Sequence, residues 1–73
     1  MQNNQTVDAR GLSCPQPVIM ARQAIQELGK GTIEVIVDSG TARDNVSRTG
    51  KNSGWSVKVE EQTGGFFKVM LQK

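Results

Sequence analysis

The fold of this chain is decided by the stretch VDARGLSCPQPV, residues 7–18, which is typical of a strand end, a glycine turn and a helix start. Val7 and Ala9 close a short strand, and Gly11 lets the chain turn. Pro15 fits the first helical position, where the N–H that proline lacks has no intrahelical partner in any case. The stretch therefore predicts a strand over residues 6–9 and a helix that begins at Pro15 and has Cys14 as its N-cap.

Cys14 is the only cysteine and the chain has no histidine, so thiol chemistry depends on one sulfur without imidazole help. An N-cap side chain normally accepts a hydrogen bond from the second or third helical N–H. Pro17 would be the third residue and has no N–H, which leaves the Gln16 N–H as the donor to the sulfur. A helix N-terminus stabilises an anion by about 0.3–1 kcal/mol, so the helix predicts a modestly activated thiol, to which Arg10 can add positive charge. The alternative reading is a small buried hydrophobe.

These residues resemble the signature of the TusA/SirA-like sulfur-carrier proteins. The CPxP core at 14–17, together with the Asp-x-Arg-Gly-Leu at 8–12, is far more specific than a lone cysteine, and the resemblance covers about residues 7–71. It is strongest to the amino-terminal TusA-like domain of YedF-type proteins, which are linked to selenium metabolism and usually continue into a DsrE-like domain. Cys14 is the residue that the resemblance assigns to the sulfur. It also implies motif positions that shape the cysteine loop: Asp8, Arg10, Gly11, Pro15 and Pro17.

The resemblance implies a carrier that accepts sulfane sulfur as a persulfide on Cys14. The implied donor is a cysteine desulfurase, and the acceptor is a DsrE-like or other protein in tRNA thiolation, a cofactor pathway or a selenium pathway. Such a carrier acts stoichiometrically, as a sulfurtransferase-like monomer with no cofactor beyond the transient persulfide. The rival hypotheses are a regulatory protein- or RNA-binding module in which Cys14 is only structural, and a redox sensor that uses a partner's thiol.

Composition limits the other classes of function. A chain of 73 residues forms one domain, buries only about 60% of its unfolded surface and has no room for a deep substrate cavity. No apolar run approaches the ~20 residues that span a bilayer, and one cysteine without histidine does not favour a zinc site. We expect a cytoplasmic protein. Its basic residues are scattered, which does not favour a nucleic-acid-binding function. Arg43, Arg48 and Lys51 do lie near one another, and they indicate either a contact surface or a solvated helix face.

The rest of the chain predicts the remaining elements of the fold. Residues 1–5 are polar and are expected to be disordered, which leaves residues 6–73 as the domain. Apolar residues at helical spacing predict that the first helix runs over residues 15–28, with Gly29 available as its cap. Alternation predicts strands over residues 32–37, 55–60 and 66–71, with Gln62-Thr63-Gly64-Gly65 as a hairpin turn. A second helix is expected after Thr41, which forms a weak capping box with Asp44. Gly50 inside that helix puts its length and rigidity in doubt.

The alternation of the strands predicts the architecture. Strands with one polar face indicate a sheet that is covered on one side only, so both helices should pack on the same face. The expected fold is α+β, a βαβαββ two-layer sandwich with a four-stranded mixed sheet whose first two strands are parallel. Ile36, Phe66 and Met70 would then form a small apolar patch on the open face, either a partner surface or scattered surface hydrophobes. Met20 either shields the sulfur or fills the gap between helix and sheet.

Overall fold

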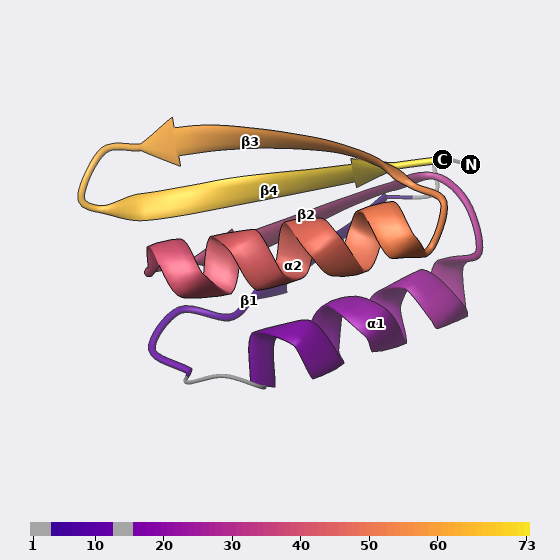
Figure 1. Ribbon diagram of the computed structural model, residues 1–73, viewed down its shortest axis with the longest axis horizontal. Helices are drawn as coiled ribbons and strands as arrows, with labels where there is room; N and C mark the ends of the chain where they lie inside the picture. Colours follow the sequence, from indigo (N-terminus) through magenta and orange to yellow (C-terminus); the bar gives the residue numbers. More distant parts are fainter. Residues whose placement is uncertain (1–3, 13–15) are drawn as a thin grey trace.

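A computed structural model describes residues 4–12 and 16–73, which form two helices and four strands in the predicted order (Figure 1). Both helices lie on one face of the sheet and leave the other face open, as the alternation of the strands predicts. The elements are β1 (Asn4–Asp8), α1 (Gln16–Leu28), β2 (Thr32–Val37), α2 (Gly40–Asn52), β3 (Ser56–Gln62) and β4 (Phe66–Gln72).

The sheet has the strand order β1-β2-β4-β3, with β2 and β4 in the centre. β1 pairs parallel with β2, so the connection through α1 is a crossover, and the other two pairings are antiparallel. This is the predicted mixed sheet. Gly31 and Lys73 exchange two backbone hydrogen bonds of 3.0 and 2.9 Å, which tie the end of β4 to the start of β2.

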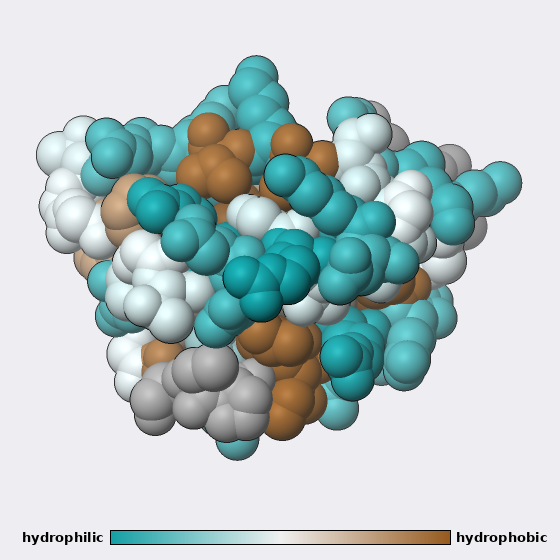
Figure 2. Space-filling model, in the orientation of Figure 1, coloured by the Kyte–Doolittle hydropathy of each residue, from teal (hydrophilic) through white to brown (hydrophobic). Residues whose placement is uncertain are grey.

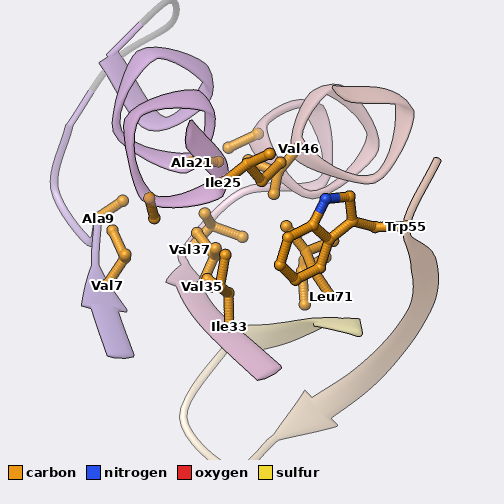
Figure 3. Packing of buried hydrophobic residues seen from close by; sticks show 13 residues of the cluster. Val7, Ala9, Ala21, Ile25, Ile33, Val35, Val37, Val46, Trp55 and Leu71 are labelled. Carbon is orange, nitrogen blue, oxygen red and sulfur yellow. The ribbon is translucent and has the colours of Figure 1, made fainter. Parts of the chain in front are cut away.

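The core lies between the sheet and the two helices (Figure 3). β2 contributes Ile33, Val35 and Val37, all fully buried on one face, as the alternation predicted for the strand over residues 32–37 requires. Buried alanines of α1, such as Ala21, have small side chains that let this helix pack close to the sheet and to α2. Met20 is half-buried and packs against this core, which favours its gap-filling role. The remaining core side chains are Val7, Ala9, Ala24, Ile25, Ala42, Val46, Trp55, Val69 and Leu71.

Three expectations about element ends are wrong. β1 starts at Asn4, although Asn4 and Gln5 were expected to be disordered. They pair with Thr32 and Ile33, because the parallel strand β2 provides backbone hydrogen-bond partners. Residues 1–3 lie outside the described part. The N-cap of α2 is Ser39, which has extended backbone angles and accepts from the Ala42 N–H at 3.1 Å, so the helix starts before the capping box expected at Thr41.

Trp55 precedes β3 instead of opening it. Its N–H donates to the Gly50 carbonyl at 2.9 Å, near the end of α2, and its indole is buried over the core (Figure 3). A carbonyl in the last helical turn has no partner within the helix. The residue that sequence alternation assigns to a strand therefore closes the preceding helix.

Gly50 does not shorten α2, which continues to Asn52. A Cβ at position 50 would lie 2.5 Å from Leu71 Cδ2 and 3.0 Å from Val57 Cγ2, closer than packed atoms approach. The glycine therefore lets the helix backbone rest directly on β3 and β4. Its low helix propensity is offset by this close packing.

Candidate functional site

The candidate site begins at a β-turn that immediately follows β1. The Ala9 N–H donates to the Ile36 carbonyl at 2.8 Å and so continues the pairing with β2 for one residue beyond the strand. The Leu12 N–H then donates to the Ala9 carbonyl at 3.4 Å, which closes the turn Ala9–Leu12. Gly11 is the third residue of this turn and has a φ of 77°. A positive φ at that position is what a type II turn requires and what glycine supplies without strain.

Two carboxylates hold the central N–H groups of this turn. Asp8 Oδ1 accepts from the Arg10 N–H at 3.2 Å and from Arg10 Nε at 2.9 Å, while its Oδ2 accepts from Arg10 Nη2 at 2.8 Å. Asp38, which follows β2, accepts from the Gly11 N–H through Oδ2 at 2.7 Å. The turn is thus fixed both by a motif residue and by a residue that is distant in sequence.

The Asp8–Arg10 pair also sets the local electrostatics. The side-chain hydrogen bond from Arg10, with its backbone hydrogen bond next, lowers the pKa of Asp8 to about 2. The same bond to Asp8 raises the pKa of Arg10. Both side chains are about half exposed, so the pair stays ionised in water without the desolvation cost of a buried ion pair. Its role is to shape the turn, because exposed ion pairs contribute little to global stability.

Phe66 brings the β3–β4 hairpin next to the turn that follows β1. The guanidinium of Arg10 lies over the Phe66 ring, 5.0 Å from its centroid, at a distance typical of a cation–π contact. Asp8, Arg10, Gly11 and Phe66 line an open depression of about 460 Å³. Phe66 was expected only as part of an apolar patch, and no role in the site was predicted for Asp38. No local pattern could link either of them to a turn that precedes them by many residues.

The helix that follows the motif starts in the described part at Gln16. Gln16 is exposed, Pro17 is buried, and the described first turn contains no acidic side chain. Pro17 is therefore accommodated inside the helix start, as the sequence predicts. Cys14 and Pro15 lie outside the described residues, so the N-cap role of Cys14 and the hydrogen bond from the Gln16 N–H to its sulfur remain predictions.

Large apolar side chains are exposed on both sides of the motif cysteine in sequence. Leu12 is 39% exposed and Ile19 is 42% exposed. Ile19 lies opposite the buried stripe of α1, and Figure 2 shows hydrophobic surface over the first turns of that helix. Sequence reasoning did not single out either residue, although an isoleucine outside the helical apolar spacing was a usable signal.

The predicted apolar patch lies among charged residues. The strand register places Ile36 beside Lys68 and diagonal to both Phe66 and Met70, and all three apolar residues are half-buried. Glu34 pairs with Met70, so the open face mixes acidic, basic and apolar side chains. A partner role for this patch stays a prediction.

The expected basic cluster on α2 is partly neutralised. Arg43 contacts Asp44 at 3.0 Å and lies over the Phe67 ring, 4.7 Å from its centroid. Lys58 on β3 also faces an acid, Glu60, at 4.0 Å. These pairings favour ordinary surface roles over a basic nucleic-acid footprint. Within the described ranges, neither helix has the length and apolar character needed to cross a membrane.

Comparisons with known proteins agree on one family. A family profile described as "Sulfurtransferase TusA" matches residues 5–73. A protein of Methanocaldococcus jannaschii named as a candidate sulfur carrier is 34% identical, over 92% of this chain and 91% of its own. The sulfur carrier protein TusA of Allochromatium vinosum is 26% identical, over 96% of this chain and 93% of its own.

A solved structure shows the same fold. The crystal structure of a SirA-like protein from Desulfitobacterium hafniense superposes with a TM-score of 0.90 at 34% identity. The match covers 93% of this chain and 95% of that one. The two-layer sandwich predicted from the strand alternation is therefore also the architecture of a related protein.

Proposed function

The chain belongs to the TusA family of sulfur carriers, and from this premise we propose that it carries sulfane sulfur as a persulfide on Cys14. The donor in this proposal is a cysteine desulfurase that holds a persulfide on its own cysteine. The acceptor is a second protein, DsrE-like or of another class, in a thiolation, cofactor or selenium-related pathway of the cytoplasm.

The proposed transfer step conserves atoms and electrons. The Cys14 thiolate attacks the terminal sulfur of the donor persulfide, a new bond forms between Cys14 Sγ and that sulfur, and the sulfur–sulfur bond of the donor breaks. The electron pair of the broken bond leaves with the donor cysteine as a thiolate. The transferred sulfur keeps its oxidation level, so the step needs neither an external oxidant nor a metal. A second transfer of the same kind releases the sulfur to the acceptor.

The observation that carries the proposal is the hydrogen-bonded turn at residues 9–12, which ends two residues before the only cysteine. Asp8 and Asp38 fix its two central N–H groups, although only Ala9 of the turn lies in the core and its last three residues are exposed. A loop held in this way suits a cysteine that must enter the site of another protein, because a preformed loop loses less conformational freedom on docking. The open depression beside the turn suits protein-to-protein transfer better than capture of a small substrate.

A relay experiment tests this function against that of a binding module. The protein is loaded with a cysteine desulfurase and isotopically labelled cysteine, separated from the donor, and mixed with candidate acceptors. We expect the label to move to an acceptor from wild type and never from Cys14→Ser. In cells, Cys14→Ser should behave like a deletion. Full activity of Cys14→Ser in cells would contradict the carrier and support a binding role.

A further inference from the structure

We propose that Asp38 is a positioning residue for the Cys14 loop, an inference that rests on the proposed carrier function. Asp38 lies outside the cysteine motif and follows β2, but its Oδ2 accepts the Gly11 N–H at 2.7 Å across 27 positions of sequence. This bond joins the turn before the cysteine to the connection between β2 and α2.

The backbone on both sides of Asp38 is firmly held, which makes it a suitable anchor. Val37, the preceding residue, is fully buried in the core. Ser39, the following residue, is the N-cap of α2 and binds the Ala42 N–H. The carboxylate therefore projects from a point where strand and helix both restrict the chain. In the turn that it binds, only Ala9 is buried, and the residues from Arg10 to Leu12 are exposed.

The Gly11 N–H is the group through which such an anchor can act. In a β-turn the two central N–H groups point away from the turn's own hydrogen bond. Asp8 accepts a hydrogen bond from the first of them, the Arg10 N–H, and this contact is local to the motif. Asp38 accepts from the second, and this contact relates the turn to the β2–α2 connection. Cys14 follows Gly11 by three residues, so the orientation of the turn sets the direction in which the chain enters the cysteine loop.

The hydrogen bond, and not the negative charge, is the basis of the proposed role. A carboxylate near the loop disfavours a thiolate electrostatically. Asp38→Asn keeps an acceptor oxygen and removes the charge, whereas Asp38→Ala removes both. Asp44→Ala is the matched control, since Asp44 is also exposed. Within the described residues, its ion pair is with its sequence neighbour Arg43.

The experiment measures two quantities on all four proteins: the rate at which a cysteine desulfurase loads Cys14, and the exchange rate of the Gly11 amide hydrogen. For Asp38→Ala we expect loading to slow about 2- to 10-fold, the effect of one ordinary hydrogen bond, and Gly11 exchange to accelerate. Asp38→Asn should stay close to wild type in both, and Asp44→Ala should match wild type. Thermal unfolding of each variant verifies that the protein is folded at the assay temperature.

Loading of folded Asp38→Ala at the wild-type rate would overturn the proposal, because Asp38 would then serve the fold alone. Equal Gly11 exchange in wild type and Asp38→Ala would overturn it as well. Faster loading of Asp38→Asn than of wild type would show that charge, not position, dominates. If wild type itself takes up no sulfur from an active desulfurase, the carrier function is contradicted, and Gly11 exchange alone decides whether Asp38 holds the turn.

Discussion

At the scale of single residues, the motif before the cysteine is explained by its own hydrogen bonds. Asp8 binds both the backbone and the side chain of Arg10, and Gly11 takes the positive φ that closes the turn. Gly11 was predicted as the turn residue from the sequence itself, and all three positions were predicted to shape the loop from the resemblance of the motif. The structure adds a physical reason for each of them, and it adds Phe66 as the surface against which Arg10 lies.

The Asp8–Arg10 pair predicts a small acid-dependent term in stability, because an exposed ion pair contributes little. The hydrogen bonds from Arg10 lower the pKa of Asp8 from 3.8 to about 2 in the folded protein. The folded state therefore binds this proton less readily than the unfolded chain, so the stabilisation is complete above about pH 4 and is lost as the pH falls toward 2. Asp8→Asn should lose this term, and its free energy of unfolding should decline less than that of wild type over the same interval.

Chemical denaturation at a series of pH values from 2 to 6 measures this term. Asp44→Asn removes one exposed carboxylate from α2 and controls for the change in net charge. Parallel curves for wild type and Asp8→Asn would contradict the role assigned to the pair.

At the scale of elements, Gly50 sets how closely α2 approaches the hairpin. Gly50→Ala should destabilise the protein although alanine is the better helix former. The new methyl group would lie 2.5 Å from a side-chain atom of the fully buried Leu71, and overpacking costs about 1–3 kcal/mol, against a propensity gain of up to about 1 kcal/mol. We expect the melting temperature to fall by several degrees.

Gly40→Ala is the matched substitution in the same helix. A Cβ at position 40 makes only ordinary contacts with the flexible Arg43 side chain, so this variant should be at least as stable as wild type. Equal melting temperatures for the two alanine variants would show that close packing at position 50 does not matter.

The corrected N-cap of α2 gives a second prediction for that helix. The Ser39 side chain accepts the Ala42 N–H, so Ser39→Ala should cost about 0.5–2 kcal/mol in the free energy of unfolding. Thr41→Ala should change it by less than about 0.5 kcal/mol, because Thr41 is exposed within the first turn. Urea denaturation of both variants measures the difference, and a larger loss for Thr41→Ala would restore the capping box expected from sequence.

The elements also show why sequence predicted the interior of the fold better than its junctions. Alternation in β2 and helical spacing in α1 are periodic, so they identified the buried faces of these elements. Ser39, Trp55 and Gly50 are each determined by a single contact with another part of the chain. The same holds for the site: Asp8 and Gly11 act locally and could be predicted, whereas Asp38 and Phe66 reach the turn only through the tertiary fold.

At the scale of the whole molecule, the two faces of the sheet separate a phenylalanine that contacts the motif from one that packs against the core. Phe66 and Phe67 are neighbours in β4, so their side chains point to opposite faces. Phe66 lies on the open face beside Gln62 and contacts Arg10 of the motif. Phe67 pairs with the buried Val37 on the helical face and packs against the core.

This separation predicts opposite effects for one substitution made at two adjacent positions. Phe66→Leu removes the ring under Arg10 and should slow the loading of Cys14 about 2- to 5-fold, which corresponds to an exposed cation–π contact of about 0.5–1 kcal/mol, with little change in melting temperature. Phe67→Leu should lower the melting temperature and leave the loading rate of the folded protein unchanged. Equal effects of the two variants on loading would contradict the assignment of Phe66 to the motif.

The central claim is that sulfur is carried on Cys14, and intact-protein mass spectrometry tests it most directly. The reduced protein is incubated with an active cysteine desulfurase and cysteine, beside Cys14→Ser. We predict a species heavier by one sulfur atom that disappears on reduction and is absent from Cys14→Ser. Failure of wild type to gain that mass with several active desulfurases, or the same gain in Cys14→Ser, would contradict the account.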